Sequence, residues 1–246
     1  MLNRIVLKLS GEAIGSESTQ GSYNDVIVDS IVKQIIEVRK AGTHIALVVG
    51  GGNIWRGIQA RPDMDRVKAD QMGMLATIMN AIYLKEAFKR FGQKSRILTP
   101  MAVGNITTVY DKDHAIDIMA RNMVVINAAG LGHPMFSTDT VTALRAAELE
   151  ADCALYAKNI DGVYDSDPKQ NPGAKKYQTL NYATAIKNNL QAADLTAMLM
   201  SRDAKIPSYV FSLNDKNSII DAAAFPYTNN LKGTYIHVNK EDKFYD

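Results

Sequence analysis

The sequence predicts an α/β fold in which a mostly parallel central sheet lies between two layers of helices, a three-layer α/β/α sandwich. First, its short β-branched runs are apolar at every position, as strands covered on both faces require. Second, longer segments with helical spacing separate these runs, so strand and helix alternate along the chain. Third, the length of 246 residues suits one α/β domain or two lobes that share a sheet.

Six continuous apolar or β-branched runs are expected to form strands. They are residues 5–7, 45–49, 123–126, 153–156, 208–211 and 234–238. The segments with helical spacing are 28–36, 72–88, 141–149 and 190–199. The polar stretch 165–176, which contains prolines and a glycine, is expected to be a linker or mobile loop between two halves. The charged tail from Asn239 is expected to fray.

Composition argues against several classes of function. The chain is 46% hydrophobic and 22% charged, and its net charge of +2 is too small for a surface that binds nucleic acid. The single cysteine, Cys153, lies in an apolar stretch and is expected to be a buried thiol in a reducing compartment. No secretory leader is visible, and no apolar run approaches the ~18 residues of a membrane span. A cytoplasmic location without membrane partners is therefore expected.

Candidate phosphate-binding residues follow the first two strands, because ligands collect beyond the carboxyl ends of strands in an open α/β sheet. Lys8 ends the first strand and can reach a phosphate there, although a surface lysine is the simpler alternative. Three successive glycines, Gly50 to Gly52, follow the second strand, and their N–H groups can approach a phosphate closely. Arg56 comes next, with a guanidinium suited to phosphate oxygens or simply exposed on a loop.

Two further segments combine polar side chains with helix starts. Asp70 lies on a helix face beside Gly73 and Thr77, where a carboxylate can bind a ribose diol. The alternative is a surface pair with Arg66, four residues earlier, worth only ~0.3 kcal/mol. Residues 128–140 carry glycines, then hydroxyl groups, then an amphipathic helix. That stretch is longer than ordinary capping needs and favours a second anion site.

An acidic segment follows the strand 153–156. Its Asp161-Gly162 pair is most simply a turn, while the further acids and Tyr164 are compatible with an adenine or magnesium site. Asp194 lies later, in an otherwise apolar helical segment. It must cap that helix, be exposed, or pair with a lysine, because an unpaired buried carboxylate is costly.

Three common nucleotide-binding signatures are absent from the sequence. It contains no G-x-x-x-x-G-K-[ST] loop, no protein-kinase H-R-D or D-F-G set, and no G-x-G-x-x-G fingerprint. A phosphate site must therefore be built in another way, and a nicotinamide or flavin enzyme is disfavoured.

Four segments carry a resemblance that is far more specific together than any one alone. They are Lys8 to Ala13, Gly50 to Gly57, Asp70 to Thr77 and Asp161 to Tyr164. In this order they are similar to the bacterial UMP kinases (uridylate kinases) of the amino acid kinase family, over nearly the whole chain. The resemblance implies a homohexamer, magnesium dependence, and transfer of a phosphoryl group from ATP to UMP, giving UDP for pyrimidine nucleotide synthesis. It also implies an allosteric enzyme with UTP as feedback inhibitor.

The resemblance assigns residues by position within a single domain, 1–246. An acceptor-binding lobe would span about residues 1–150 and an ATP-binding lobe about residues 151–246. Lys8, Asp194 and Arg56 would be catalytic, with Asp194 orienting Lys8, and no metal ligand is assigned. The ATP-binding residues would be Lys8, Leu9, Ser10, Gly11, Gly52, Arg56, Asn159, Tyr164 and Asp167. The UMP-binding residues would be Gly51, Asp70, Leu131, Gly132, His133, Pro134, Met135, Phe136, Ser137 and Thr138.

Three segments depart from the family pattern. The family's Thr-Gly-Asn-Pro type of sequence is replaced by Leu131 to Pro134, which leaves the side-chain contacts of positions 131 and 133 open. The fit around Lys158-Asn159 is ambiguous by one residue, so the second active-site lysine is not placed. The glycine-rich segment tied to GTP activation corresponds to Gly15 to Tyr23 with an apparent insertion. Weak or missing activation by GTP is expected.

The expected chemistry needs no general base. A phosphate monoester acceptor has its second pKa near ~6 and is already largely ionised, so positioning and charge neutralisation would drive the transfer. One alternative is another kinase of this fold, acting on acetylglutamate or carbamate. A second is a catalytically silent nucleotide-binding oligomer, which the presence of Lys8, Asp194 and the glycine turn disfavours.

Overall fold

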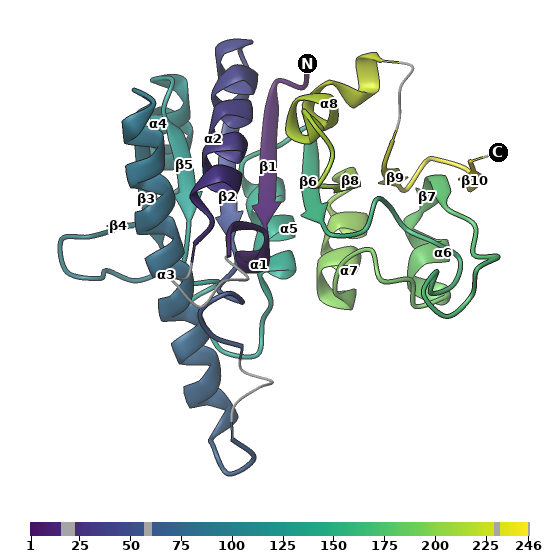
Figure 1. Ribbon diagram of the computed structural model, residues 1–246, viewed down its shortest axis with the longest axis horizontal. Coiled ribbons are helices and arrows are strands. Elements are labelled where there is room, and N and C mark those ends of the chain that lie inside the picture. Colours follow the sequence, from purple (N-terminus) through teal and green to yellow (C-terminus); the bar gives the residue numbers. More distant parts are fainter. Residues whose placement is uncertain (16–22, 57–60, 229–231, 246) are drawn as a thin grey trace.

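One mixed sheet of ten strands organises the chain (Figure 1). The computed structural model describes residues 1–15, 23–56, 61–228 and 232–245. Across the sheet the strands follow the order β10-β7-β9-β8-β6-β1-β2-β5-β3-β4. Neighbouring strands are parallel except for two antiparallel pairs, β8 with β9 and β7 with β10. The strands are β1 (Arg4–Leu9), β2 (His44–Val49), β3 (Ser95–Thr99), β4 (Thr108–Val109), β5 (Val124–Asn127), β6 (Cys153–Lys158), β7 (Tyr177–Asn181), β8 (Ser208–Ser212), β9 (Thr234–His237) and β10 (Lys243–Phe244).

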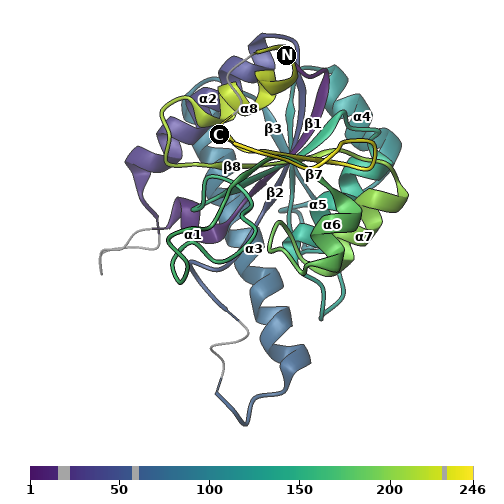
Figure 2. The ribbon, with the colours of Figure 1, turned by 90° about the vertical axis from the view of Figure 1, so that its right-hand side faces the viewer.

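Helices cover both faces of the sheet and confirm the three-layer α/β/α prediction (Figure 2). One layer contains α2, α3 and α8, and the other contains α4, α5, α6 and α7. Their bounds are α1 (Gly11–Ile14), α2 (Asp25–Lys40), α3 (Arg66–Arg90), α4 (Lys112–Ala120), α5 (Thr138–Glu148), α6 (Tyr182–Lys187), α7 (Leu195–Asp203) and α8 (Ser218–Ala224), followed by a 3-10 turn at Phe225–Tyr227. None of the described helices combines the length and the apolar composition that crossing a bilayer requires.

The central strand β1 shows why the strand sequences are continuously apolar. Its side chains alternate between two cores, with Ile5, Leu7 and Leu9 in the core shared with α2 and α3. Val6 lies in the opposite core, beneath α4 and α5. Lys8 projects to the same side as Val6, because the two are separated by one residue. The alternation therefore directs the amine of Lys8 toward α5 at the end of the strand.

The helix α3 is longer than the periodicity predicted and projects from the body of the protein (Figure 1). It begins after Asp65, whose side chain accepts a hydrogen bond from the N–H of Lys68. Its C-terminal half packs on the sheet. A row of large apolar side chains along it stays exposed, namely Met72, Leu75, Met79 and Ile82. Spacings of three and four residues place these side chains on one face.

The C-terminal tail is ordered, so the prediction that it frays from Asn239 was wrong. Strand β10 pairs with β7, and the ring of Phe244 stacks on that of Tyr177 with 4.3 Å between ring centroids. Asp242 accepts hydrogen bonds from the N–H of Asn181 and the hydroxyl of Thr184. The stretch 165–176, expected to lie between two halves, instead connects β6 to β7 of the same sheet.

Candidate active site

Several loops meet at one edge of the sheet, beyond the carboxyl ends of its central parallel strands. In the parallel register, Leu9 of β1 lies beside Val49 of β2 and Ala157 of β6. The loops that follow β1, β2, β5 and β6 therefore leave the sheet side by side. This is the edge at which open α/β sheets bind their ligands. The sequence motifs that suggested phosphate binding all lie there.

The turns after β1 and β2 approach so closely that glycine is required. A Cβ atom at Gly11 would lie 2.5 Å from the backbone nitrogen of Gly52, and one at Gly50 would lie 2.9 Å from the backbone nitrogen of Gly11. The buried Asn80 of α3 fixes the second turn by donating to the carbonyl oxygen of Gly50 at 2.6 Å. Ser10 caps α1 by accepting from the N–H of Ala13 at 3.1 Å. The two turns thus form one rigid backbone cradle.

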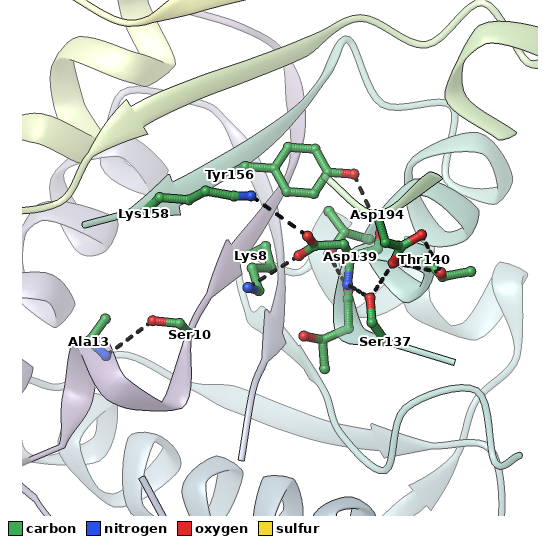
Figure 3. Close-up of polar contacts among 11 residues, drawn as sticks. Lys8, Ser10, Ala13, Ser137, Asp139, Thr140, Tyr156, Lys158 and Asp194 are labelled. Atoms are coloured by element: carbon green, nitrogen blue, oxygen red, sulfur yellow. Dashed lines mark hydrogen bonds and ion pairs between the residues drawn. The ribbon is translucent and has the colours of Figure 1, made fainter. Parts of the chain in front are cut away.

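Two lysines share one carboxylate at the centre of this edge (Figure 3). The amine of Lys8 lies 3.1 Å from Oδ1 of Asp139, and the amine of Lys158 lies 3.8 Å from Oδ2. The lysine side chains are only 13% and 21% exposed, so their attraction to Asp139 is weakly screened. The Lys8 contact lacks hydrogen-bond geometry, and Oδ1 has no hydrogen-bond donor among the described residues. The contact between Lys8 and Asp139 is therefore an ion pair whose strength depends on charge and distance.

The surroundings of Lys158 weaken its hold on a proton. Burial is the largest influence and lowers the pKa of Lys158 below that of an ordinary lysine. The carboxylate of Asp139 acts in the opposite direction, and the nearby positive charge of Lys8 lowers the pKa further. Two amines and one carboxylate leave a net positive charge, which suits a phosphate ligand.

Asp194 does not make the expected direct contact with Lys8. It is the N-cap of α7, accepting from the N–H of Ala197 at 2.7 Å, and it also accepts hydrogen bonds from the hydroxyls of Ser137 and Thr140. The ion pair of Lys8 within the described structure is with Asp139. Of the alternatives left open for Asp194 the structure shows the helix cap, and a role of Asp194 in orienting Lys8 stays a prediction. Asp194 fixes the start of α5, the helix that carries Asp139 (Figure 3).

A large cleft of about 960 Å³ opens beside the lysines, on the β6 and β8 side of the sheet. It is lined by five of the predicted ATP-binding residues: Lys8, Ser10, Asn159, Tyr164 and Asp167. Leu9, Gly11 and Gly52 lie in or beside the backbone cradle and not on the cleft wall. Arg56 pairs with Glu12, which does line the cleft. Both side chains of this pair are half-exposed, so Arg56 is accessible to a ligand.

A smaller pocket of about 160 Å³ lies between α3 and the loop after β5. Its lining includes six of the predicted UMP-binding residues: Gly51, Asp70, His133, Pro134, Phe136 and Thr138. Leu131, Gly132, Met135 and Ser137 belong to the same loop but do not line the pocket. Asp70 pairs with Arg66 at 2.9 Å and also accepts from the N–H of Met135 at 3.0 Å. Asp70 thus forms the surface pair with Arg66 and also lines the pocket, and its contact with UMP stays a prediction.

Sequence reasoning missed three contributions to the site. Lys158 was left unplaced, and its position at the end of β6 is the same signal that identified Lys8 on β1. Asp139 was taken as a neighbour of the anion site and not as the partner of both lysines. Asn188 and Gln191 line the large cleft from the segment after α6, where no motif marked them. The segment 16–22, which holds the apparent insertion, lies outside the described residues.

The described residues contain no group of three or more His, Cys, Asp or Glu side chains placed to hold a metal ion. The carboxylates that line the large cleft are scattered along its wall: Glu12, Asp161, Asp165 and Asp167. Magnesium commonly binds through one or two carboxylates plus substrate phosphates, and it keeps several waters. This donor set therefore fits an ion that is carried mainly by the phosphates of a nucleotide, with a carboxylate of the large cleft as an added ligand.

Fold and site together define an α/β protein with two pockets and a pair of lysines at one edge of its sheet, an arrangement suited to phosphorylated ligands. The profile of the amino acid kinase family matches residues 3–212, and the chain belongs to that family. The crystal structure of a UMP kinase from Bacillus anthracis is similar with a TM-score of 0.93 and 31% identity, over 100% of this chain and 99% of that one. A UMP kinase from Ureaplasma parvum is similar with a TM-score of 0.89 and 34% identity, over 96% and 99%.

Proposed function

We propose that this protein is a UMP kinase, which transfers the terminal phosphoryl group of ATP to UMP and releases UDP and ADP. One observation carries the proposal: Lys8, Asp139 and Lys158 form a charged group where the two pockets adjoin. Lys8 lines the large cleft, while Thr138, the neighbour of Asp139, lines the small pocket. The full-length likeness to two UMP kinases supports the choice of substrates.

The pocket linings support an assignment of donor and acceptor. The residues lining the small pocket all come from the first 138 positions, and most of those lining the large cleft come from residues 157–212. These linings support the proposal of an acceptor lobe of about 1–150 and a donor lobe of about 151–246 within one domain. UMP would lie over Gly51 and Asp70, with its phosphate at the N-terminus of α5 beside Thr138. ATP would occupy the large cleft, with its terminal phosphate directed at Lys8.

In this arrangement the transfer depends on position and charge. The UMP phosphate is largely ionised at neutral pH and attacks the γ-phosphorus in line, so no side chain needs to remove a proton. The amines of Lys8 and Lys158 neutralise the charge on the equatorial oxygens, while Asp139 keeps the two amines together. The backbone N–H groups of the glycine cradle bind the transferring group. Magnesium, held by the phosphates of ATP and by carboxylates of the large cleft, would supply further neutralisation of the phosphate charge.

The family resemblance suggests further properties of the assembled enzyme. We infer a homohexamer, and the exposed apolar face of α3 (Met72, Leu75, Met79 and Ile82) is suited to packing against the same face of a second copy. The resemblance also implies feedback inhibition by UTP, and a product such as UDP would place the enzyme in pyrimidine nucleotide synthesis. A cytoplasmic enzyme is consistent with the buried free thiol of Cys153. Light scattering of the purified protein tests the oligomeric state. A kinase assay with and without UTP tests the inhibition.

The test of function is a substrate panel. ADP release is measured with ATP and magnesium in the presence of UMP, CMP, AMP, acetylglutamate or carbamate. We expect turnover with UMP to exceed that with the other acceptors. The variant Lys8→Ala is expected to lower kcat by at least about 100-fold with little change in UMP affinity, which excludes a contaminating kinase. Turnover with acetylglutamate or carbamate instead of UMP would identify another kinase of the fold. Absence of turnover with every acceptor would identify a catalytically silent nucleotide-binding protein.

A further inference from the structure

The C-terminal tail contacts the outer side of the donor-cleft wall. Beyond the pairing of β10 with β7, the last described residue, Tyr245, is held at two points. Its N–H donates to the carbonyl oxygen of Lys176 at 3.0 Å, and its hydroxyl donates to the carbonyl oxygen of Gly233 at 2.7 Å. The tail is thus fixed to the residue that precedes β7 and to the residue that precedes β9.

Lys176 joins this tail to the cleft. Its amine donates to Oδ2 of Asp161 at 2.7 Å and to the carbonyl oxygen of Lys232 at 3.0 Å, and it lies 4.6 Å from the ring centroid of Tyr245. The lysine side chain is only 19% exposed, so the ring and the carboxylate enclose it. Asp161 in turn accepts from the hydroxyl of Tyr164 at 2.9 Å. Asp161 and Tyr164 both line the large cleft, whereas Lys176 and Tyr245 do not.

The wall segment between Asp161 and Tyr164 has no room to shift independently of Lys176. A Cβ atom at Gly162 would lie 2.7 Å from the hydroxyl of Thr234 and 2.9 Å from the Cδ atom of Lys176. The hydroxyl of Thr234 accepts from the N–H of Val163 at 2.8 Å and donates to the carbonyl oxygen of Tyr177 at 2.6 Å. The wall is therefore packed directly against the side chain of Lys176.

We propose that Lys176 is a positioning residue of the donor site, held by Tyr245, and that it fixes Asp161 and Tyr164 on the wall that faces the nucleotide. This inference rests on the proposed binding of ATP in the large cleft. Lys176 acts through Asp161 and touches no substrate. Its charge is suited to the task, since a charge-assisted hydrogen bond is stronger than a neutral one. The tail thereby contributes to nucleotide binding from outside the cleft.

The charge state of Asp161 agrees with this geometry. Partial burial acts to raise the pKa of Asp161, but the hydrogen bonds from Lys176 and Tyr164 outweigh it and lower that pKa below its usual value. The carboxylate is therefore ionised at neutral pH and accepts both hydrogen bonds at once. Without Lys176, no cation would oppose the effect of burial, which raises the pKa of Asp161.

The experiment compares variants on the two sides of this contact. Lys176→Ala removes the amine, Lys176→Arg keeps a cation that can donate, and Tyr245→Ala removes the ring. Lys240→Ala is the matched control, because Lys240 is a tail lysine whose amine lies 6.0 Å from the ring of Tyr235, away from the cleft. For each we measure kcat, KM for ATP and for UMP, the Kd of a non-hydrolysable ATP analogue by calorimetry, and the Tm.

Lys176→Ala is expected to weaken binding of the analogue and raise KM for ATP by about tenfold, with kcat and KM for UMP within about twofold. Tyr245→Ala is expected to act in the same direction by about threefold, since the amine loses one of its neighbours. Lys176→Arg is expected to restore most of the affinity, and Lys240→Ala to change none of these values. A merely structural role would lower the Tm without this selective effect on ATP.

Unchanged affinity for the analogue in folded Lys176→Ala protein would overturn the proposal, as would an equal loss in Lys240→Ala. Should Lys176→Ala not fold, unchanged affinity in Tyr245→Ala overturns it instead. Wild-type protein that binds the analogue but phosphorylates no UMP refutes the proposed function and leaves the comparison of affinities valid. The two failures are therefore distinguishable.

Discussion

Replacing Asp139 by asparagine tests the central charge arrangement of the site. Asparagine keeps the shape of the side chain and one oxygen acceptor but removes the negative charge between the two lysines. Lys8 and Lys158 then face each other with no counter-charge between them, in a region where both are mostly buried. We expect the amines to separate, so that neither occupies the position from which it neutralises the transferring phosphate.

The size of the effect follows from the two distances. At 3.1 and 3.8 Å, and with an effective dielectric constant of about 20, the Coulomb attractions are about 5 and about 4 kcal/mol. Desolvation of three charges offsets much of this, and removing one partner of a buried pair costs about 3–5 kcal/mol in the free energy of unfolding. For a chain of this size that corresponds to a fall in Tm of about 6–20 °C. Loss of one positioned charge in the transition state lowers kcat by about 100-fold or more.

The assay combines thermal unfolding with steady-state kinetics at saturating ATP and UMP. The control variant is Asp203→Asn, which removes an exposed partner of Arg202 and is expected to change stability by less than about 1 kcal/mol. The reasoning is refuted if Asp139→Asn keeps kcat within threefold of the wild-type value and melts at the same temperature. In that case the carboxylate of Asp139 would not position the two lysines.

Two further predictions concern the proton on Lys158 and the acceptor turn. Because burial lowers the pKa of Lys158 and the transfer needs its charged form, kcat is expected to fall as pH rises through that lowered pKa, and Lys158→Arg should remove this alkaline limb. In Gly51→Ala, the new Cβ would lie 2.9 Å from the carbonyl oxygen of Gly73 and from the Cβ of Ala76. It is expected to raise KM for UMP about tenfold and to cost about 1–3 kcal/mol of stability.

An alkaline limb that is identical in the wild-type protein and in active Lys158→Arg would assign the titration to another group. For the acceptor turn the control is Gly173→Ala, whose Cβ would meet nothing closer than 3.3 Å on an exposed loop. Equal effects of Gly51→Ala and Gly173→Ala on KM for UMP would show that the turn does not shape the acceptor pocket.

Most of the strands that sequence alone predicted are almost fully buried, with the exception of β9, in which every second side chain is half-exposed. Strands β1, β2, β5, β6 and β8 lie inside the sheet, so their apolar runs are continuous and the pattern is unambiguous. Strand β7 was missed because Tyr177 and Leu180 are buried while their neighbours are half-exposed, which blurs the signal. Strand β10 has two residues, and only its partner β7 gives it structure. Long-range pairing of this kind leaves no local trace in the sequence.

The site was predicted through its backbone motifs more reliably than through its charge partners. The glycine turns were found because a close backbone approach excludes Cβ atoms, and this restricts the residue type at Gly11 and Gly50 directly. Nothing comparable identifies which carboxylate a lysine will meet. Asp139 and Asp194 both lie at helix starts, and only the packing of α5 against β1 places Asp139 at Lys8.

Asp139 and Asp194 lie close together but have different partners: Asp139 pairs with the lysines, whereas Asp194 accepts hydrogen bonds from neutral donors. The carboxylate of Asp194 already accepts from one backbone N–H and two hydroxyls, so its lone pairs are largely satisfied without a cation. Two of those donors, Ser137 and Thr140, flank Asp139 on the first turn of α5. Asp194 therefore anchors the turn, and Asp139 is left with its charge directed at Lys8 and Lys158. Because the packing of α5 against β1 then brings Asp139 to the ends of β1 and β6, the lysines pair with Asp139.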